Sequence, residues 1–388
     1  MKKLAIVSTH PIQYYAPLFK LMAENNSMEI KIFYTWGQAK DTILDKDFGI
    51  ERKWDIPLLE GYEYQFVENV SKQPGSHHYK GIINPTLISD IEDWNANAIL
   101  IFGWNFQSHL KAIRYFKGKI PIIFRGDSTL LDEPSGFSIK KIARRVFLTW
   151  VYKHIDIALY VGKANKAYYK VHGLKEEQLI FAPHAIDNNR FATITQEQEY
   201  FIKKTKQHFQ IVDTDITFVF CGKFQPKKNP LLLLNTFKQI LQQNIHLIFV
   251  GNGELENEMK AIATNDARIH FLPFQNQSFM PTIYRLGDVY CLPSSGPGET
   301  WGLAVNEAMA CRKAVLVSNK CGCSYDLIQE GINGFVFKTN DTKDLAEKID
   351  LLAISKQQLQ QMGKASESII QIWNFKKIAE VIHKLIIA

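Results

Sequence analysis

The chain lacks the features that would assign it to several special classes of protein. Among its 388 residues no apolar run approaches the roughly 20 residues that a membrane-spanning helix needs. No long block of like charges marks a nucleic-acid-binding tail, and no Cys and His spacing matches a zinc finger. There is also no repeat of fixed short period and no low-complexity tract. These absences leave a globular protein as the expectation.

No secretory signal is expected at the N-terminus either. The basic start Met1-Lys2-Lys3 is followed by a short apolar run, 4–7, which is too short for the hydrophobic region of a signal peptide and reads better as a buried strand. Cysteine is scarce and odd in number, with five residues, which favours reduced thiols and a cytoplasmic location. Zinc takes about four ligands, and Cys321-Gly322-Cys323 has no second close pair, so no metal site is expected.

The length, composition and net charge of the chain are those of an ordinary globular protein. A chain of 388 residues predicts two domains, and 46% hydrophobic with 22% charged residues is typical of globular proteins. The net charge of +7 is compatible with an anionic substrate, an anionic membrane surface or nucleic acid. The basic residues are scattered rather than striped, which argues against nucleic acid as a partner.

Short apolar runs alternate with helical patterns in two series, which predicts the α/β class with two Rossmann-like parallel-sheet domains. We place the domains at 1–192 and 193–371, because the segment around 193–200 is polar and weakly periodic, and expect a C-terminal helix at about 372–388 to pack back on the first domain. The expected strands are 3–8, 29–34, 98–102, 121–125, 157–161, 216–221, 246–250, 268–271, 288–292, 314–317 and 334–337.

The most informative stretch is 288–310. An apolar strand-like run is followed by a loop rich in Gly, Pro and Ser and then by a helical pattern, and such a helix N-terminus is a ready anion site. Backbone N–H groups around Trp301, Gly302 and Leu303 would point out of the turn. Glu299 and Glu307 would repel phosphate, so they suit hydroxyl groups better. A ligand that carries both a diphosphate and many hydroxyls is a nucleotide sugar.

Five segments match the signatures of one family in the order that the family has them. They are the Glu299-to-Glu307 pair of acids, the 221–228 element, the 250–253 turn, the 330–335 turn, and a segment with Gly173, Pro183, Asp187 and Phe191. The chain therefore resembles a retaining, nucleotide-sugar-dependent glycosyltransferase of family 4. That resemblance implies the GT-B fold, in which two Rossmann-like domains face each other across a cleft. The match extends over roughly 150–388.

The resemblance implies a donor site in the second domain. Glu307 would accept hydrogen bonds from the ribose, and Glu299 would contact the donor sugar near C3 and C4. The backbone near Phe274 and Gln275 would read the base, with UDP-sugars favoured and GDP-sugars second. The rest of the implied donor site consists of Gly222, Thr300, Trp301, Gly302 and Leu303.

By the same resemblance Lys223 and Lys228 would bind the diphosphate and stabilise the charge of the leaving group, with Glu299 beside them. Lys223 stands where the family usually has Arg, and Lys227 is expected to be a solvated neighbour. With two ammonium groups in place, no metal and no other cofactor is expected. Asp213-Thr214-Asp215 resembles the metal site of another glycosyltransferase fold, but it precedes a strand and would face away from the site.

The N-terminal third departs from the family, because 9–15 replaces its usual Gly-Gly turn. Polar side chains that follow expected strands are candidates for the acceptor side: His10, Gln13, Asn105, Arg125 and His184. Asp127 is the candidate base on the acceptor hydroxyl. The segment Arg125-Gly126-Asp127 could equally be an internal salt-bridged turn.

A basic amphipathic helix is expected at 139–153. It carries no acid, and its apolar residues recur at helical spacing beside Trp150. Such a helix suits an anionic bilayer surface. The alternative is a helix that faces the core and exposes only its basic side.

The combined expectation is a cytoplasmic retaining glycosyltransferase of polysaccharide or glycoconjugate biosynthesis, with a glycan or lipid-linked acceptor and a peripheral location at the inner membrane face. A GT-B nucleotide-sugar epimerase is the alternative among enzymes. A non-catalytic protein that binds nucleotides or nucleic acid is the alternative from another class, and the intact Glu299, Glu307 and lysine pair argue against it.

Overall fold

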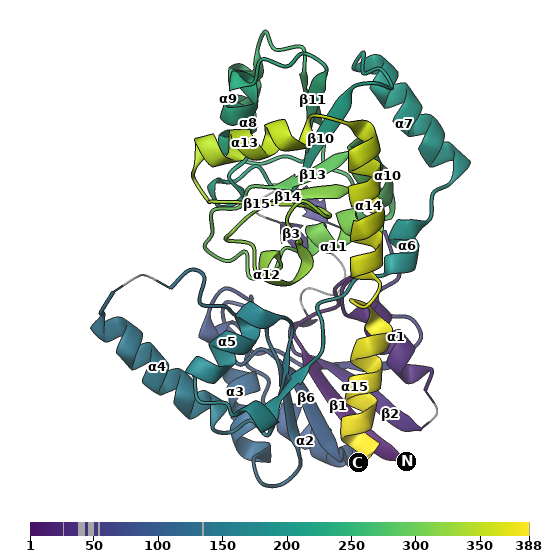
Figure 1. The fold of residues 1–388 in the computed structure, drawn as a ribbon. Helices are drawn as coiled ribbons and strands as arrows, with labels where there is room; N and C mark the ends of the chain where they lie inside the picture. Colours follow the sequence, from purple (N-terminus) through teal and green to yellow (C-terminus); the bar gives the residue numbers. More distant parts are fainter. Residues whose placement is uncertain (26, 38–42, 46–49, 53–54, 134–135, 388) are drawn as a thin grey trace. The chain divides into compact units, whose positions relative to one another are not determined.

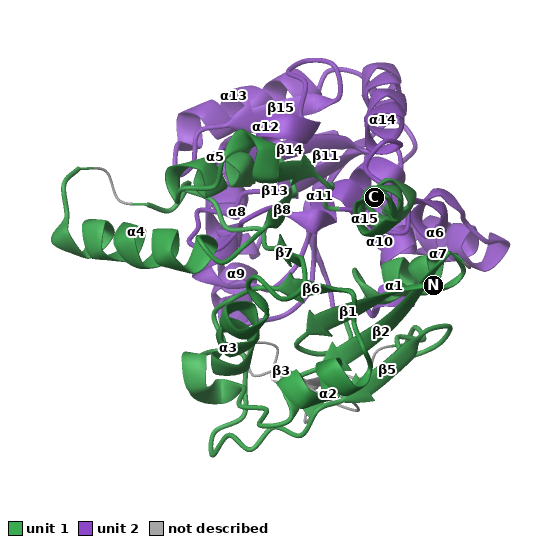
Figure 2. Cartoon of the chain, turned by 90° about the horizontal axis from the view of Figure 1, so that it is seen from below, with its two compact units in different colours: residues 1–43, 52–184, 375–388 green, residues 44–51, 185–374 purple. Residues whose placement is uncertain are grey.

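The computed structural model describes residues 1–388 except 26, 38–42, 46–49, 53–54, 134–135 and 388. The chain divides into two compact units (Figure 2). Unit 1 contains residues 1–43, 52–184 and 375–388, and unit 2 contains 44–51 and 185–374. Helix α6 (Asn188–Ala192), which the sequence-based division placed in the first domain, lies in unit 2, where the carbonyl oxygen of Phe191 accepts a hydrogen bond from Arg285.

Unit 1 is built on a seven-stranded parallel sheet with the order β5-β2-β1-β6-β7-β8-β9 (Figure 1). Its central strands are continuous apolar runs with helices on the sheet, as parallel sheets require. The strands are β1 (Lys2–Ser8), β2 (Met28–Tyr34), β5 (Glu63–Phe66), β6 (Ala98–Phe102), β7 (Ile122–Arg125), β8 (Ile157–Tyr160) and β9 (Leu179–Phe181). The helices are α1 (Ala16–Ala23), α2 (Leu87–Asp93), α3 (Gln107–Phe116), α4 (Ile139–Tyr152), α5 (Lys163–Val171) and α15 (Phe375–Ile387), with single turns at Tyr79–Gly81 and Glu176–Gln178.

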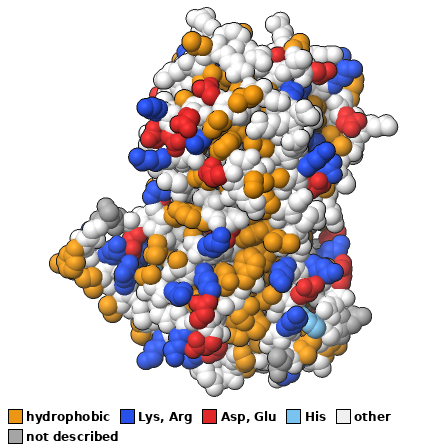
Figure 3. Space-filling model, in the orientation of Figure 1, with side chains coloured by type: hydrophobic (Ala, Val, Ile, Leu, Met, Phe, Trp, Pro, Cys, Tyr) orange, Lys and Arg blue, Asp and Glu red, His pale blue; other side chains and the backbone are white. Residues whose placement is uncertain are grey.

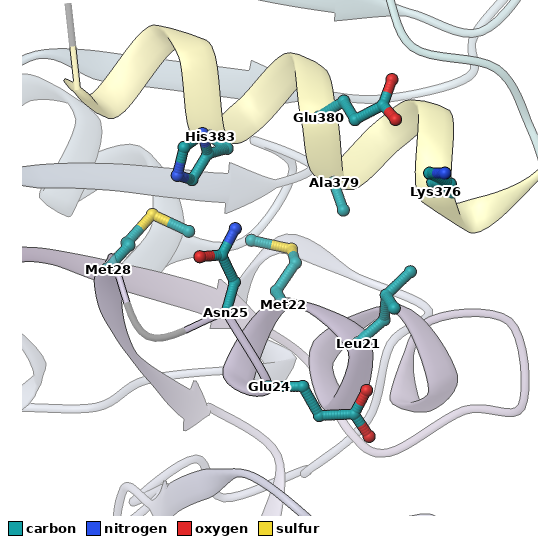
Figure 4. Close-up of a pocket in the computed structure, with 9 residues that line it drawn as sticks. All are labelled: Leu21, Met22, Glu24, Asn25, Met28, Lys376, Ala379, Glu380 and His383. Carbon is teal, nitrogen blue, oxygen red and sulfur yellow. The ribbon is translucent and has the colours of Figure 1, made fainter.

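The last helix of the chain, α15, packs on the first helix, α1, inside unit 1 (Figure 1). Its buried face consists of Phe375, Ile378, Ile382 and Ile386. A surface pocket of about 320 Å³ lies along this seam (Figure 4). It is lined by Leu21, Met22, Glu24, Asn25, Met28, Lys376, Ala379, Glu380 and His383.

Unit 2 is built on a six-stranded parallel sheet with the order β12-β11-β10-β13-β14-β15. The strands are β10 (Ile216–Cys221), β11 (Ile245–Val250), β12 (Ile269–Leu272), β13 (Val289–Leu292), β14 (Ala314–Ser318) and β15 (Gly334–Phe337). Besides α6, its helices are α7 (Gln196–His208), α8 (Pro230–Gln239), α9 (Glu256–Ala263), α10 (Met280–Leu286), α11 (Leu303–Ala310), α12 (Ser324–Leu327), α13 (Thr342–Leu352) and α14 (Lys356–Ile370), with single turns η4 (Pro226–Lys228) and η5 (Gln277–Phe279).

The two Rossmann-like parallel sheets confirm the predicted fold class. The sequence-based strand list omitted β5 and β9, and the expected polar linker after residue 192 contains α7 instead. A two-stranded ribbon, β3 (Ile43–Asp45) with β4 (Ile50–Arg52), was also not expected. Within the part of the chain that the structure describes, no helix has the length and apolar character needed to cross a membrane.

Candidate functional site

Two loops at the carboxyl edge of the unit 2 sheet pack closely against each other because glycine leaves room for the neighbouring backbone. An added Cβ on Gly251 would lie 2.0 Å from the carbonyl oxygen of Gly222, and one on Gly253 would lie 2.6 Å from that of Phe224. The φ angles of Gly251 and Gly253 are +142° and +152°, a region that other residues rarely adopt. The loops that follow β10 and β11 can therefore approach each other only with glycine at these positions.

The loop 293–302 between β13 and α11 is fixed by a neighbouring backbone segment. Gly302 precedes α11 with a φ of +98°. The N–H of Gly322 donates to Glu299 O at 3.3 Å, and that of Cys323 donates to Trp301 O at 3.0 Å. A Cβ on Gly322 would lie 1.8 Å from Thr300 O, so this close approach also depends on glycine. The motif Cys321-Gly322-Cys323 thus holds the loop through its backbone.

Lys228 and Glu299 meet at this edge. Lys228, at the end of η4, donates from Nζ to Glu299 Oε2 at 2.5 Å, and Ser294 donates from Oγ to the same oxygen at 2.8 Å. The side chains of Lys228 and Glu299 are 23% and 13% exposed. Lys227, by contrast, is exposed, and its carbonyl oxygen accepts from Ser295 N at 2.9 Å. The two adjacent lysines therefore have different environments, as the sequence analysis expected.

Glu307 lies in the middle of α11 and is 2% exposed. The hydroxyl of Tyr284, on α10, donates to Glu307 Oε2 at 2.6 Å. Burial, together with the nearby charge of Glu307, raises the pKa of Tyr284 well above its usual range, so this hydroxyl stays a donor. The hydrogen bond from Tyr284 therefore fixes the orientation of the Glu307 carboxylate.

The remaining predicted donor-site residues line the same edge. Lys223 and Gly222 follow β10, Phe274 and Gln275 follow β12, and Thr300 and Leu303 flank the start of α11; all six are half-buried. Trp301 is buried instead. Its Nε1–H donates to Asn306 Oδ1 at 2.9 Å and its ring packs on that of Trp373. The Trp301 side chain therefore supports the loop from inside unit 2 instead of being exposed to a ligand.

Asp213 and Asp215 lie at the opposite end of β10 from Lys223. Asp215 is buried, and its Oδ2 accepts from Val212 N at 2.9 Å and lies 3.3 Å from His246 Nε2. Over the described ranges, no group of three or more His, Cys, Asp or Glu side chains is arranged to hold a metal ion.

In unit 1 four of the five predicted acceptor-side residues lie at or just after the ends of the adjacent parallel strands β1, β6 and β7, and so share one edge of the sheet. The fifth, His184, follows β9 in the same sheet. His10 and Gln13 follow β1 and are half-buried, whereas Asn105 follows β6 and is exposed. The ring of His10 packs edge-on against Trp36 with 5.2 Å between centroids. Burial lowers the pKa of His10 to about 4, so this imidazole is neutral near pH 7.

Arg125, Asp127 and His184 form a second group at that edge. Arg125, the last residue of β7, is buried and donates to Ala182 O and Pro183 O at 2.8 Å each, so its guanidinium holds the chain beyond β9. Asp127 is 48% exposed, with Oδ2 3.7 Å from Nε2 of the buried His184. Burial lowers the pKa of His184, and the Asp127 carboxylate opposes the shift. Of the three side chains, Asp127 is the accessible one.

A buried histidine in the same unit predicts that the folded protein loses stability as the pH falls. His109 on α3 is fully buried, and burial lowers its pKa from 6.5 to about 4. The unfolded chain therefore binds a proton below about pH 6.5 that the folded chain does not bind until about pH 4. Stability should fall as pH decreases through this window, by about 3 kcal/mol for His109 when the shift is fully expressed.

Calorimetric unfolding between about pH 7 and pH 5 measures this effect. The His109→Asn variant should lose less stability over the same interval than the unchanged protein, whatever its stability at pH 7. Identical pH dependence in the two proteins would contradict the assignment.

The sequence analysis missed Tyr284 and Ser294, which contact Glu307 and Glu299. Ser294 had a signal, because it lies in the same Ser- and Pro-rich loop as Glu299. Tyr284 had none, since its contact with Glu307 depends on the packing of α10 against α11.

Part of the second half of the chain is similar to a known family. Residues 201–368 match the family model described as glycosyl transferases group 1. The match covers 168 of the 388 residues of the chain. The candidate site around Lys228, Glu299 and Glu307 lies inside the matched region.

Two curated relatives match part of the chain. Lipopolysaccharide 1,2-N-acetylglucosaminetransferase of Salmonella typhimurium is 27% identical over 53% of this chain and 56% of its own length. UDP-Gal:alpha-D-GlcNAc-diphosphoundecaprenol alpha-1,3-galactosyltransferase of Escherichia coli is 24% identical over 58% of this chain and 60% of its own length. The chain thus matches little more than half the length of these relatives.

Solved structures match along the whole chain. Anabaena HepE in complex with UDP and glucose has a TM-score of 0.69 and 16% identity, covering 99% of both chains. WaaG, a glycosyltransferase involved in lipopolysaccharide biosynthesis, has a TM-score of 0.67 and 12% identity, covering 99% of both chains. With the two parallel sheets, these similarities show the GT-B fold for the chain.

Proposed function

We propose that this protein is a metal-independent, retaining glycosyltransferase of family 4 that transfers a sugar from a nucleoside diphosphate to an acceptor hydroxyl. The observation that carries the proposal is the arrangement of Lys228, Glu299 and Glu307 around the loop before α11. The ammonium group of Lys228 has three N–H donors, so it can bind Glu299 and a phosphate oxygen together. The match of residues 201–368 to glycosyl transferases group 1 supports the reaction class.

In the proposed reaction the bond between the sugar C1 and the diphosphate oxygen breaks, and its electron pair stays on that oxygen. The acceptor oxygen forms the new bond to C1 on the same face, and its proton passes to a base, for which Asp127 is the candidate. Lys228 and Lys223 stabilise the developing negative charge more than they stabilise the ground state. Glu299 accepts hydrogen bonds from the donor sugar, and Glu307 from the ribose.

We propose a UDP-sugar as the donor and a glycan or lipid-linked hydroxyl as the acceptor, on the cytoplasmic side. The similar Anabaena HepE structure contains UDP and glucose, and one curated relative is named for a diphosphoundecaprenol acceptor. His10, Gln13 and Asn105, at the carboxyl edge of the unit 1 sheet, are the proposed acceptor-side contacts, together with Asp127.

A panel of nucleotides tests the donor. UDP at about a hundred times its Kd should raise the free energy of unfolding by about 2.7 kcal/mol, because it binds only the folded state. GDP and ADP at equal concentration should give smaller shifts in melting temperature. A larger shift with GDP would change the donor assignment, and no shift with any of the three would contradict nucleotide binding.

A further inference from the structure

Three lysine side chains gather near one carboxylate at the amino edge of the unit 2 sheet. The carboxylate belongs to Asp288, just before β13. Its backbone N–H donates to Thr217 O at 2.7 Å, and its Oδ2 accepts from Thr217 N at 2.9 Å. Its carbonyl oxygen accepts from Ala314 N at 3.2 Å. Asp288 is therefore fixed between β10 and β14, at the opposite end of the sheet from Glu299.

The three lysines come from different elements of unit 2. Lys206 lies in the last turn of α7, Lys313 in the turn between α11 and β14, and Lys356 at the first position of α14. All three side chains are half-buried. We call the lysines and the acid together the Asp288 cluster: Lys206, Asp288, Lys313 and Lys356.

The Asp288 cluster contains more ammonium groups than acceptors for them. Lys356 Nζ lies 3.6 Å from Asp288 Oδ2, the oxygen that also accepts from the backbone of β10. For Lys206 and Lys313, no ion pair or hydrogen bond joins the ammonium group to another residue of the described part of the chain. One acid thus serves three cations, although half-buried charges normally have partners.

The pKa values of the two lysines without ion pairs reflect this imbalance. Burial lowers the pKa of Lys313 from 10.5 to about 8; Asp288 opposes the shift and Lys206 adds to it. Burial also lowers the pKa of Lys206, with Asp288 and Asp213 opposing the shift and Lys356 adding to it. Lys313 remains charged near pH 7, so its positive charge is held where water screens it poorly.

The neighbouring groups do not restore the balance. Arg285 adds positive charge near Lys313, and its guanidinium is already bound to the carbonyl oxygens of Pro281 and Phe191. Asp213 is exposed, so solvent screens its charge. Elsewhere over unit 2, the face in Figure 3 shows Asp and Glu side chains among the Lys and Arg side chains. The excess of positive charge is therefore a local property of the Asp288 cluster.

We propose that the Asp288 cluster binds a phosphate dianion, either inorganic phosphate or the phosphate group of a small metabolite. The phosphate oxygens would accept from Lys206 and Lys313, while Lys356 remains beside Asp288. Two negative charges balance the two ammonium groups that have no ion pair, whereas a carboxylate would balance only one. The site lies at the amino edge of the sheet, so the proposal does not depend on the proposed reaction at the carboxyl edge.

Thermal unfolding in phosphate tests the proposal. The melting temperature of the full chain should rise with inorganic phosphate until it saturates, and more than in sodium chloride of equal ionic strength, because the dianion binds only the folded state. Lys206→Gln/Lys313→Gln should weaken phosphate binding roughly tenfold or more, from the usual contribution of hydrogen bonds to charged groups. Since phosphate also stabilises folded proteins in general, the comparison between variants decides the outcome.

The single variant Lys313→Gln should have an opposite effect without phosphate. In phosphate-free buffer it should melt at a higher temperature than the unchanged protein, because it removes a charge that burial and Lys206 disfavour. Phosphate should narrow or reverse this difference. A variant that melts lower in both buffers by the same amount would contradict the proposal, because Lys313 would then only support the fold.

Two control variants separate this site from other lysines. Lys203→Gln removes an exposed lysine of the same helix α7, and Lys228→Ala alters the proposed donor site. Both should respond to phosphate like the unchanged protein. If Lys228→Ala abolishes the response, or the Lys206→Gln/Lys313→Gln protein keeps it, the proposal is wrong. A titration with glycerol phosphate distinguishes the two sources: tighter binding than phosphate indicates a metabolite, and weaker binding indicates inorganic phosphate.

Discussion

Replacing Lys228 with Ala is expected to reduce the rate of sugar transfer by on the order of a hundredfold or more, as loss of a preorganised donor in an active site does. Lys228 is partly buried against Glu299, so its ammonium is positioned before any substrate arrives. Its removal takes away positive charge where the leaving diphosphate gains negative charge, and leaves the Glu299 carboxylate there. Initial rates with a UDP-sugar donor measure the loss.

The neighbouring lysine provides the control. Lys227→Ala should change the rate little, because Lys227 is exposed and contributes its backbone carbonyl to the loop. Lys228→Arg should keep more activity than Lys228→Ala, since the charge remains although the reach differs. The chelator EDTA should leave the rate nearly unchanged. Equal losses at both lysines, or activity that EDTA abolishes and manganese restores, would contradict this role of Lys228.

Replacing Glu307 with Gln should weaken binding of UDP about tenfold to a hundredfold while the protein stays folded. Hydrogen bonds to a charged group contribute roughly 1.5–3 kcal/mol, and the amide loses the charge and one acceptor oxygen. Gln is preferred to Ala here because Glu307 is buried, and Ala would leave the hydroxyl of Tyr284 without its partner. Titration calorimetry with UDP gives the affinity.

Tyr284→Phe extends this test to the residue that holds Glu307. Its effect should be smaller, about twofold to tenfold, because one neutral donor is removed and Glu307 remains. Glu258→Gln, on the exposed side of α9, is the control and should bind UDP normally. A folded Glu307→Gln protein with unchanged affinity would remove Glu307 from the nucleotide site.

The central strands of this fold can be predicted from the sequence because they are buried on both faces. The ranges 98–102 and 216–221 agree with β6 and β10 residue for residue, since a continuous apolar run bounded by turn residues has few alternatives. Helix α7 was missed because its apolar periodicity is weak. Its local signal was the reciprocal capping pair Thr195 and Gln198, which fixes the start of the helix.

The candidate site is easiest to propose from sequence where one segment contains its residues, and harder where the direction of a side chain decides its role. The loop before α11 and its two acids are contiguous in sequence. Arg125 follows the rule that polar residues lie at strand ends, yet its guanidinium binds the carbonyl groups of Ala182 and Pro183. Ile139 and Val146 on α4 have the spacing of a core-facing helix, yet they are 78% and 66% exposed, so periodicity alone could not distinguish solvent from core.

The packing of α15 on α1 has a consequence for how the protein is made. Synthesis runs from the N-terminus, and domains generally fold as their residues leave the ribosome. Here the surface of α1 that α15 covers stays open until residues 375–387 emerge, after all of unit 2. The first unit to be synthesised is therefore the last to be completed, and a ribosome that stalls within unit 2 leaves a nascent chain with this apolar seam exposed to chaperones and proteases.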